Sequence, residues 1–299
     1  MDVRILGGLS VREHGVSITP TAAAPRQLLA LLTASADQVV PVTVLTEELW
    51  PSGPPRGARA ELQGHIAELR SLIAGALRGA APAEPRPGWA DRRTAEAVLV
   101  SQPGGYRLDT GGGAHDVWQF QRAAGAGYRA MEAGDLPRAA LRLGEALALW
   151  RGEPYAGVAA GPRLRREIER LETSRLSVLD QWMEAQLGLG GHAEVVPELS
   201  GLTARYRTNE PLHAHFMVAL LRCGQHEEAL AAFERLSAAL LAESGMEPSA
   251  RLHRLRRSVL AVRDTAGRPV YVPRVPTQFN PTQFSPGRGR LVPVGSSVG

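Results

Sequence analysis

The stretch Pro41–Ile73 reads PVTVLTEELWPSGPPRGARAELQGHIAELRSLI and decides the fold that we expect for the N-terminal part of this chain. Its first part predicts a helix that begins at Thr43, a typical N-cap residue, and carries apolar side chains as far as Trp50. The Pro/Gly-rich run Pro51–Pro55 would end that helix. A second helix is expected to begin near Arg56. Its apolar stripe recurs with helical spacing at Leu62, Ile66, Leu69 and Ile73. Two helices that meet at a short break can present the second one to the major groove of DNA.

The residues before this stretch predict a small antiparallel sheet and one more helix. Short strand-like runs are separated by tight turns at Gly7-Gly8 and His14-Gly15. These runs are Val3–Leu6, Leu9–Arg12 and Val16–Ile18. Pro25 stands where the helix would begin, since proline is favoured in the first turn of a helix. Val39–Val42 is expected to be an extended link.

A β-hairpin is expected after the second helix of the stretch. A loop rich in Pro, Ala and Arg runs from Gly79 to Arg93. Ala97–Ser101 and Tyr106–Asp109 then predict two strands around the turn Pro103-Gly104-Gly105. A sheet, three helices and a hairpin in this order are typical of a winged helix-turn-helix. We therefore predict an α+β winged helix-turn-helix domain over residues 1–110, followed by a Gly-rich joint.

The sequence after the joint predicts helices throughout and contains an internal repeat. Similar segments surround Gly134, Gly190 and Gly224, and the last two glycines are 34 residues apart, the period of tetratricopeptide repeats. Each glycine would end one helix and let the next helix pack closely against it. An extra helical segment, Arg163–Gln186, would separate the first repeat from the second. We predict an all-α, tetratricopeptide-like domain over residues 115–262.

The C-terminal residues 263–299 predict a disordered tail, because they are rich in Pro, Gly and Ser. The tail also holds the whole excess of positive charge. Residues 1–110 carry eleven Arg and eleven acidic residues, residues 111–262 carry eighteen of each, and the tail carries five Arg and one acid. The predicted N-terminal domain is therefore formally neutral. The basic tail would add an attraction to phosphates that fades as salt rises.

Composition excludes several classes of protein. The chain has 299 residues, enough for two domains with real cores, and no apolar run approaches the roughly 18 residues of a membrane span. The N-terminus lacks the pattern of a signal peptide, and the single Cys223 cannot form an internal disulfide. We therefore expect a cytoplasmic protein without a membrane contact. All 34 basic residues are Arg, so the phosphate-binding loop G-x-x-x-x-G-K-[ST], which needs Lys, is impossible.

No catalytic residue, cofactor or metal site is expected. The sequence has no H-E-x-x-H motif and no pair of cysteines. His213 and His215 are two residues apart, so on one helix they would point about 200° apart and could not bind one metal ion together. Trp118, Trp150 and Trp182 recur every 32 residues, which favours core anchors of the helical array over a ligand cage. These observations predict a protein that is not an enzyme.

Short segments along the chain follow one another in a recognisable order. The first are PRQLLALLT, VVPVTVLTEELWPSGPPRGA, LQGHIAELRSLI and SQPGGYRLD, and the later ones are DVWQF, ALALWRG, GHAE, ALAAF and GMEP. In this order they resemble the winged-helix module and the bacterial transcriptional activation domain of the Streptomyces antibiotic regulatory proteins. The resemblance covers residues 3–262.

The resemblance implies a function and its partners. Members of this family are DNA-binding activators, often of a secondary-metabolite gene cluster such as one for antibiotic biosynthesis. They bind direct repeats in promoters and contact RNA polymerase and its sigma factor. The partners expected here are therefore double-stranded promoter DNA, polymerase with its sigma factor, and a second copy of the chain as a homodimer or tandem pair. Binding of two copies would raise avidity.

Candidate DNA-contacting side chains lie on the second helix of the opening stretch. On a helical wheel, Arg56, Gln63 and Arg70 flank one side of the face opposite the apolar stripe, where they could contact base edges or phosphates. Ordinary solvated surface is the alternative for Arg56 and Gln63. Arg59 lies nearer the core edge, and both Arg59 and Arg70 could instead lie along the core or pair with an acid.

Further candidates lie outside that helix. Arg107 would touch a phosphate or the minor groove from the wing, while Tyr106 would pack in the core. Arg26 and Gln27, near a helix N-terminus, could help to bind a phosphate or could be plain surface.

The centre of the expected recognition face is sparse. Relatives usually have Thr or another polar residue where this chain has Gly64, and an aromatic residue where it has His65. Gly64 and Ala67 offer few groups that could read bases. Either DNA shape and the wing supply more of the recognition, or this member binds weakly. A second hypothesis is therefore a helical-repeat adaptor whose degenerate winged domain serves protein contacts.

Overall fold

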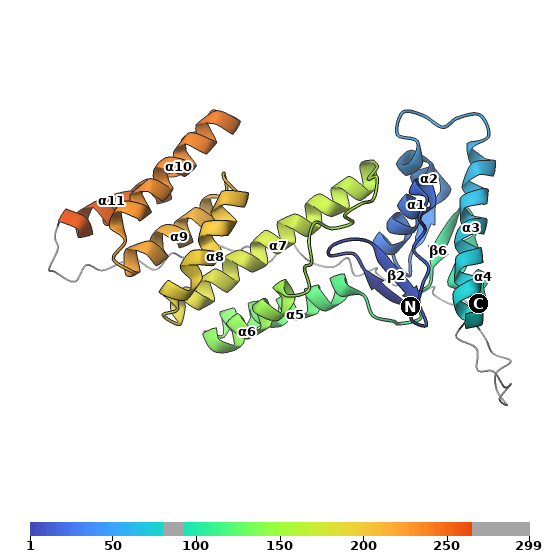
Figure 1. Ribbon diagram of the computed structural model, residues 1–299, viewed down its shortest axis with the longest axis horizontal. Helices are drawn as coiled ribbons and strands as arrows, with labels where there is room; N and C mark the ends of the chain where they lie inside the picture. The colour runs from blue at the N-terminus through green and yellow to red at the C-terminus, as the bar shows by residue number, and fades with distance from the viewer. Residues whose placement is uncertain (80–92, 265–299) are drawn as a thin grey trace, which may run out of the picture.

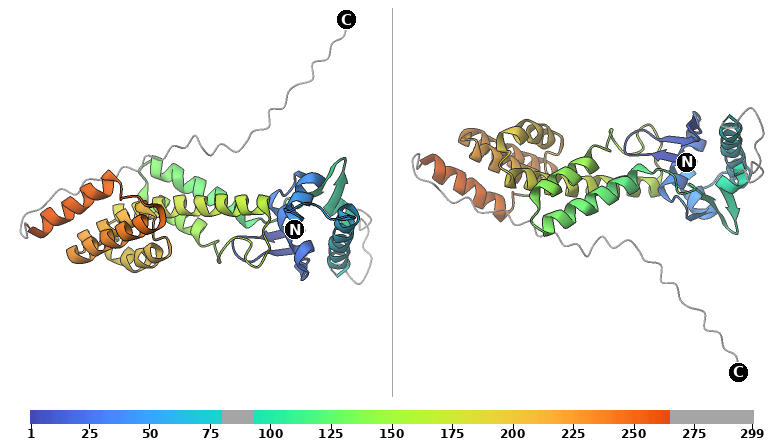
Figure 2. Two further views of the ribbon diagram at one scale, coloured as in Figure 1. Left: turned by 90° about the horizontal axis from the view of Figure 1, so that it is seen from above. Right: turned by 90° about the horizontal axis from the view of Figure 1, so that it is seen from below.

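The computed structural model describes residues 1–79 and 93–264, which are mostly helical with two small sheets near the N-terminus (Figure 1). The molecule is elongated. The N-terminal elements form one end, α10 (His226–Ser244) and α11 (Ala250–Asp264) form the other, and the long helix α7 (Pro162–Gly188) runs between them (Figure 1, Figure 2). A mostly helical chain with small N-terminal sheets agrees with the coarse fold class expected from the sequence.

The first sheet is antiparallel in the order β1-β2-β3, as predicted. Its strands are β1 (Asp2–Arg4), β2 (Ser10–Glu13) and β3 (Val16–Ser17). Val3 and Val11 pair across β1 and β2 and are both fully buried, so the sheet covers part of the N-terminal core. The predicted turn at His14-Gly15 is confirmed, because both residues have a positive φ, 49° and 82°.

Helices form at the places expected in the N-terminal part, with corrections to their ends. They are α1 (Ala23–Ala34), α2 (Val42–Leu49) and α3 (Ala58–Gly79). Pro25 is the third residue of α1 and not the first. The expected N-cap Thr43 is wrong, because Thr43 lies inside α2 and the N-cap is Pro41, which makes no side-chain hydrogen bond.

Helix α3 keeps the predicted apolar stripe but starts later than expected. Its buried residues include Leu62, Ile66, Leu69 and Ile73. The helix begins at Ala58, so Arg56 lies in the preceding turn and does not share a helical face with Gln63 and Arg70. Gly57, which separates Arg56 from the helix, has a φ of 90°, a conformation that glycine adopts without strain.

The second sheet contains a strand that the sequence predicts only as an extended link. β4 (Val39–Pro41) pairs with β6 (Gly105–Leu108), and β6 pairs with β5 (Leu99–Gln102). The short helix α4 (Ala95–Val98) replaces the first part of the expected strand Ala97–Ser101. Strand β6 approaches β4 so closely at Gly105 that a Cβ there would collide with the carbonyl oxygen of Val40. Strand β6 is therefore held between β4 and β5.

The helical half confirms the internal repeat. Its helices are α5 (Asp116–Glu132), α6 (Leu136–Leu147), α7, α8 (His192–Arg205), α9 (Glu210–Arg222), α10 and α11. Gly134, Gly190 and Gly224 each follow the end of a helix with a positive φ, 72°, 88° and 75°. Helix α7 is the predicted extra segment. Helix α11 continues to Asp264, so the predicted tail begins inside it; residues 265–299 of the tail and residues 80–92 of the predicted loop lie outside the described residues.

The buried apolar side chains form clusters that divide within α7 and not at the Gly-rich joint. One cluster runs from Val3 to Ala185 and joins the N-terminal elements to α5, α6 and α7. The other runs from Met183 to Val259 and holds α8 to α11 together. Trp150 belongs to the first cluster, and the partly buried Trp182 packs against both, which fits the expected role of these two residues as core anchors. Trp118 is half-buried, stacks on His115 and belongs to neither cluster.

A buried carboxylate on α2 caps the N-terminus of α7. The Glu48 residue is 1% exposed and its side chain accepts hydrogen bonds from the backbone N–H groups of Gly161, Arg163 and Leu164, at 2.6, 2.8 and 3.2 Å. The first N–H groups of a helix have no partner within it, and the helix dipole favours a negative charge there. Glu48 thus joins the N-terminal elements to the helical array.

A second buried carboxylate, that of Asp116, joins the same two parts at the start of α5. It accepts hydrogen bonds from the backbone N–H groups of Ile5 and Leu6 and from the guanidinium group of Arg151, the last at 2.7 Å. The loop between α6 and α7 adds backbone hydrogen bonds, because the N–H groups of Arg151 and Tyr155 donate to the carbonyl oxygens of Leu6 and Ile5.

The buried imidazole of His115 lies at this junction. Its Nδ1 atom accepts a hydrogen bond from the N–H of Val117, so Nε2 carries the hydrogen and faces the carbonyl oxygen of Thr33 at 3.3 Å. The ring stacks on Trp118, with centroids 4.7 Å apart. Burial lowers the pKa of His115 below its usual value of 6.5, although the contact with Thr33 and the charge of Asp116 oppose this effect.

None of the described helices is long and apolar enough to cross a membrane. Within residues 1–79 and 93–264, no group of three or more His, Cys, Asp or Glu side chains is placed to hold a metal ion. Of the two histidines considered above, His215 contacts Asp180 through Nε2 at 2.7 Å, and burial lowers the pKa of His213.

Substitution Glu48→Ala is expected to lower the free energy of unfolding by about 3 kcal/mol, because buried N–H groups at the start of α7 lose a charged acceptor. Chemical unfolding followed by circular dichroism measures this change. Glu47→Ala is the matched control, since Glu47 is the exposed neighbour on the same helix and should change stability by less than about 0.5 kcal/mol. Equal effects of the two substitutions would contradict the capping role of Glu48.

Stability is also expected to fall in mild acid because of His115. Below about pH 6.5 the His115 imidazole binds a proton in the unfolded chain more readily than in the folded protein. The free energy of unfolding should therefore drop by up to about 1.4 kcal/mol for each unit by which the pH falls. Above that pH the group contributes no slope. Unfolding curves measured from neutral pH downward test this. His115→Asn keeps a side-chain acceptor for the N-cap but does not titrate, so the free energy of unfolding of this variant should depend less steeply on pH. An unchanged pH dependence would contradict the assignment of this effect to His115.

Candidate nucleic-acid interface

Helix α3 lies at the outer end of the molecule, far from α10 and α11 (Figure 1). The face opposite its apolar stripe is open to solvent. Its exposed residues include Arg59, Ala60, Gln63, Gly64, Ala67 and Ser71. A helix that is anchored along one side and free along the other can enter the major groove of DNA, which is about 12 Å wide.

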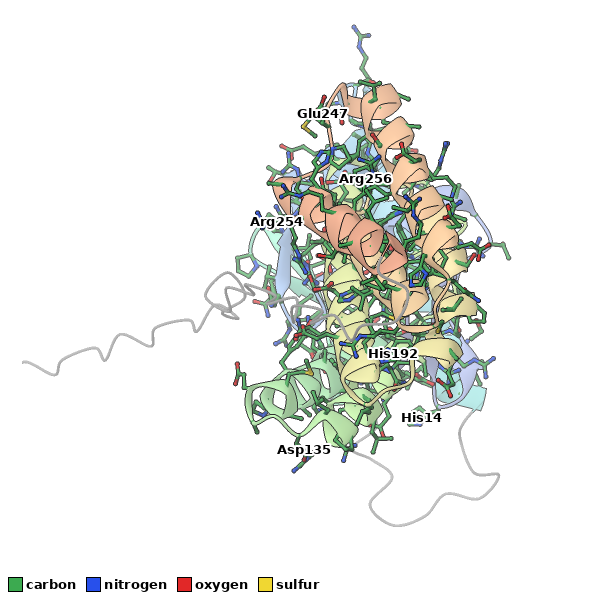
Figure 3. The ribbon with its side chains drawn as sticks, turned by 90° about the vertical axis from the view of Figure 1, so that its left-hand side faces the viewer. His14, Asp135, His192, Glu247, Arg254 and Arg256 are labelled. Atoms are coloured by element: carbon green, nitrogen blue, oxygen red, sulfur yellow. The ribbon has the colours of Figure 1, made fainter. Side chains whose placement is uncertain are left out.

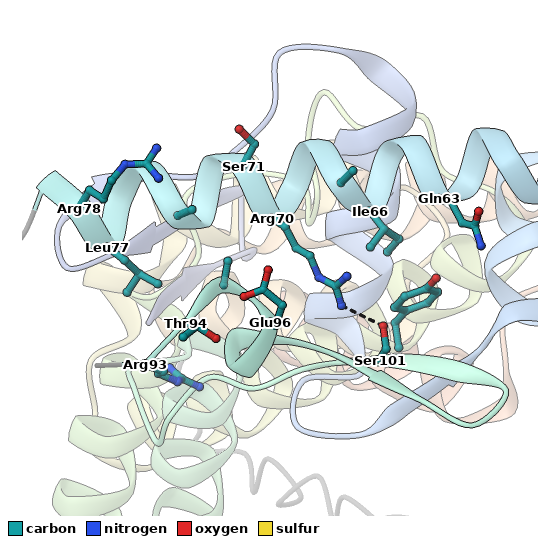
Figure 4. Close-up of a pocket in the computed structure, with 14 residues that line it drawn as sticks. Gln63, Ile66, Arg70, Ser71, Leu77, Arg78, Arg93, Thr94, Glu96 and Ser101 are labelled. Atoms are coloured by element: carbon teal, nitrogen blue, oxygen red, sulfur yellow. Dashed lines mark hydrogen bonds between the residues drawn. The ribbon is translucent and has the colours of Figure 1, made fainter. Parts of the chain in front are cut away.

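A groove of about 790 Å³ separates α3 from α4 and the β5–β6 hairpin (Figure 4). Helix α3 lines one wall with Gln63, Arg70 and Arg78, and the opposite wall includes Thr94 and Ser101. The walls therefore combine amide, guanidinium and hydroxyl groups, which donate hydrogen bonds to phosphate oxygens in protein–DNA complexes. They also include one carboxylate, that of Glu96 on α4 (Figure 4).

Arg70 fastens the hairpin to α3. Its Nε and Nη2 atoms donate to the carbonyl oxygen of Leu99 at 3.2 and 2.8 Å, and Nη2 donates to Oγ of Ser101 at 2.9 Å (Figure 4). The structure therefore favours the alternative in which Arg70 lies along the protein. Its position sets the distance between the two walls of the groove.

The remaining charges of α3 are distributed unevenly. Arg56 and Arg59 are exposed, and neither they nor Gln63 form a hydrogen bond or ion pair with another described residue through their side chains. Glu61 and Glu68 lie on the flank of α3 away from the groove, where Glu61 is 3.8 Å from Nε2 of His65. The groove side of α3 is thus positive, although the N-terminal part of the chain is formally neutral.

Arg107 lies in β6, the central strand of the second sheet, and not at the tip of the hairpin. Its side chain is 35% exposed and its Nη2 atom is 3.6 Å from Oδ2 of Asp109. The neighbouring Tyr106 is partly buried and packs against the core, as expected, while also lining the groove.

The two candidates on α1 are held by internal contacts. Gln27 is 9% exposed, and its Nε2 atom donates to the carbonyl oxygen of Glu48 at 2.7 Å. This corrects the expectation for Gln27, because a buried amide with an internal partner cannot reach a phosphate. Nε of Arg26 donates to the carbonyl oxygen of Pro20 at 2.9 Å and the residue is half-buried, so its guanidinium is only partly available.

Two further arginines, which are not among the candidates from the sequence, line the groove. Arg78 is exposed in the last turn of α3. Its spacing in the sequence carries a signal, since Arg78 follows Ser71 by seven residues and so shares its side of the helix. Arg93 lies on the opposite wall and pairs with Asp109. No local pattern could have shown that contact, because the partners are 16 residues apart across a loop.

Comparisons with known proteins identify the family of the chain. Residues 115–260 match the family described as bacterial transcriptional activator domain. Regulatory protein DnrI of Streptomyces peucetius is 45% identical over 260 residues, which are 87% of this chain and 92% of DnrI. Such identity, over nearly the full length of both chains, decides the family.

The chain belongs to the Streptomyces antibiotic regulatory protein family of transcriptional activators.

Two other relatives extend the comparison. Transcriptional regulator RedD of Streptomyces coelicolor is 30% identical over 87% of this chain and 71% of its own length. The solved structure of Mycobacterium tuberculosis EmbR in complex with a low affinity phosphopeptide has a TM-score of 0.74 and 26% identity, over 87% of this chain and 65% of that chain. As a member of this family of activators, the chain acts in transcription, and such activity implies contact with DNA and with RNA polymerase.

Arg70→Ala is expected to loosen the hairpin and lower the free energy of unfolding by about 1–2 kcal/mol, because the carbonyl oxygen of Leu99 loses charged donors. Gln63→Ala, on the same side of α3, removes no internal contact and should leave stability within about 0.5 kcal/mol of the parent. Urea unfolding of both variants measures the difference. A Gln63 variant as unstable as the Arg70 variant would contradict these assignments.

Proposed function

We propose that this chain is a promoter-binding activator whose N-terminal part, residues 1–110, works as a winged helix-turn-helix. Helix α3 enters the major groove, the β5–β6 hairpin is the wing, and the groove between them accommodates the sugar-phosphate backbone. The observation that carries this proposal is the exposed outer face of α3 beside a groove whose α3 wall carries the donor side chains Gln63 and Arg78. The wing is held at a set distance from α3 by Arg70, which suits it to follow the backbone next to the recognition helix.

The side chains fall into two roles in this proposal. Arg59 and Gln63 project from the exposed part of α3 and contact base edges, while Arg56 in the preceding turn and Arg78 in the last turn contact phosphates. Arg107 contributes from the wing through the exposed part of its side chain. Gly64 and Ala67 at the centre of the face contribute shape and close approach without polar contacts.

The helical half, residues 115–262, acts in this proposal as the activating part that recruits RNA polymerase through its sigma factor. The match of residues 115–260 to a bacterial transcriptional activator domain supports this role. The extensive identity with DnrI supports a secondary-metabolite gene cluster, such as one for antibiotic biosynthesis, as the target. This function requires the compartment that contains the chromosome, which in a bacterium is the cytoplasm, and needs no catalytic group or cofactor.

Two copies of the chain are proposed to bind direct repeats as a homodimer or tandem pair. The described recognition face is small and its part of the chain has no net positive charge, so one copy alone would bind weakly. Repeats about one helical turn apart place two copies on the same face of the duplex, where each raises the effective concentration of the other.

A helical-repeat adaptor is the second candidate function. The observation that favours it is the pair Gly64 and Ala67 at the centre of the exposed face of α3, which cannot read bases by hydrogen bonds. In that case α3 would serve a protein contact and the chain would need another protein to reach DNA.

A footprint on the promoters next to the gene of this protein separates these candidates. Protection of repeated sequences by the purified chain is expected if it is a DNA-binding activator. A folded protein that protects no sequence at low salt would overturn that proposal in favour of the adaptor.

Arg59→Ala and Gln63→Ala should each weaken binding to the protected sequence by about 1–3 kcal/mol, because they remove contacts with base edges. Arg78→Ala should instead lower the slope of log affinity against log salt by about 1, as expected for loss of one phosphate contact. Fluorescence anisotropy at several salt concentrations measures both effects. Arg138→Ala, exposed on α6, is the control and should change neither. Equal losses on specific and scrambled DNA would remove Arg59 and Gln63 from base contact.

A further inference from the structure

Exposed arginines gather on the first two turns of α7. Arg163, Arg165 and Arg166 are all exposed, and none of them forms an ion pair with another residue in the described part of the chain. The carboxylates one turn further along α7 form no ion pair with these arginines: Glu167 pairs with Arg170, and Glu169 has no ion pair in the described part of the chain. We call Arg163, Arg165 and Arg166 the α7 patch.

The α7 patch lies next to the turn between α2 and α3. Gly161, the N-cap residue of α7, donates its N–H to the side chain of Glu48 at 2.6 Å. Glu48 is the second-last residue of α2, and the turn Pro51–Gly57 that follows is exposed throughout. The start of α7 therefore lies close to the end of α2.

The charges of the α7 patch oppose the electrostatics of their own helix. The N-terminus of a helix is its positive end, where acidic residues are favoured and basic ones are disfavoured. The first turn of α7 has no acidic residue, and its backbone N–H groups are already occupied by Glu48. The guanidinium groups are consequently the available donors, and their placement brings no benefit to the fold. An anion outside the described chain would supply that benefit.

The arrangement of the helices separates this anion from the DNA on α3. Helix α7 packs on α1 and α2, whereas α3 packs on α1 from the other side and presents its free face outward (Figure 1, Figure 2). Packed helices have axes roughly 8–10 Å apart. A duplex on the outer face of α3 is thus separated from the α7 patch by a layer of helices, so the carboxylates of a protein are the better partner for these guanidinium groups.

We propose that the α7 patch is a docking surface for an acidic segment of a partner protein. Arginine suits this contact because its planar guanidinium group binds carboxylates with two parallel hydrogen bonds. The inference rests on the proposed function as an activator, and it assigns the protein contact to a surface distinct from the DNA-binding face.

Two separate titrations test the docking surface in the full-length chain. One measures binding to RNA polymerase holoenzyme from a streptomycete in the absence of DNA, and the other measures binding to the footprinted promoter fragment alone. The double variant Arg165→Glu/Arg166→Glu should weaken holoenzyme binding about tenfold or more, because it places carboxylates against carboxylates. Its promoter affinity should stay within about twofold of the parent, since the patch does not face the duplex.

The control is Arg254→Glu/Arg257→Glu on α11, which changes the net charge equally at the far end of the molecule (Figure 3 labels Arg254). It should leave holoenzyme binding within about twofold of the parent, because long-range charge effects are screened by salt. The Arg165→Glu/Arg166→Glu variant should melt no lower than the parent, since acidic residues are favoured at the start of a helix. If charge reversal impairs folding, the variant Arg165→Gln/Arg166→Gln replaces it in the test. This variant should also weaken holoenzyme binding, but by less than the charge reversal does.

Unchanged holoenzyme binding by the folded double variant would overturn the docking surface, as would an equal loss in the α11 control. A parallel loss of promoter affinity would show that the patch contacts DNA and would overturn it as well. The promoter titration tests the proposed DNA binding separately. If the parent chain does not bind the promoter fragment, the proposed DNA binding is contradicted, and the result of the holoenzyme titration is unaffected.

Discussion

The carboxylate of Glu48 at the N-terminus of α7 is the contact on which the rest of the structure depends. It projects from α2, whose next residues form the turn that leads into α3, and it satisfies N–H groups that have no partner within α7. Gly161 is part of the same constraint, because a Cβ at that position would collide with the Glu48 carbonyl and carboxylate. The exposed helix at one end of the molecule is thereby tied to the long helix that supports the other end.

The junction is reinforced by contacts that are unusual for a linker between independent domains. Asp116 binds two backbone N–H groups at the end of β1, and His115 faces the carbonyl oxygen of Thr33 in α1. The apolar core continues through this junction as far as Ala185, and a second core begins at Met183. The N-terminal elements are therefore packed into one core with α5, α6 and α7, whereas α8 to α11 form a separately packed end of the array. This arrangement fits a protein that holds DNA and a second partner at the same time.

Local patterns predict a large part of this fold, and the exceptions have a common cause. The apolar stripe of α3, the turn at His14-Gly15 and the left-handed glycines after α5, α7 and α9 follow from spacing and backbone preference, which act over a few residues. The strand β4 and the role of Gln27 depend on partners distant in sequence. Gln27 donates to a carbonyl oxygen 21 residues away, and Glu48 accepts from an N–H 113 residues away.

The amino-acid sequence by itself determined the order of elements, the apolar face of α3, the repeat of helix pairs and, through the order of its short segments, the family. These features are encoded locally, because secondary-structure propensity and hydrophobic periodicity depend on neighbouring residues in the sequence and not on tertiary contacts. Only the tertiary structure decided which polar side chains are free to bind and which are already used. Arg70 and Gln27 have internal partners, Arg78 lines a groove, and three arginines of α7 lie unpaired beside the α2–α3 turn. The reason is physical: the availability of a hydrogen-bonding group depends on its neighbours in space, and the chain brings those neighbours together only when it folds.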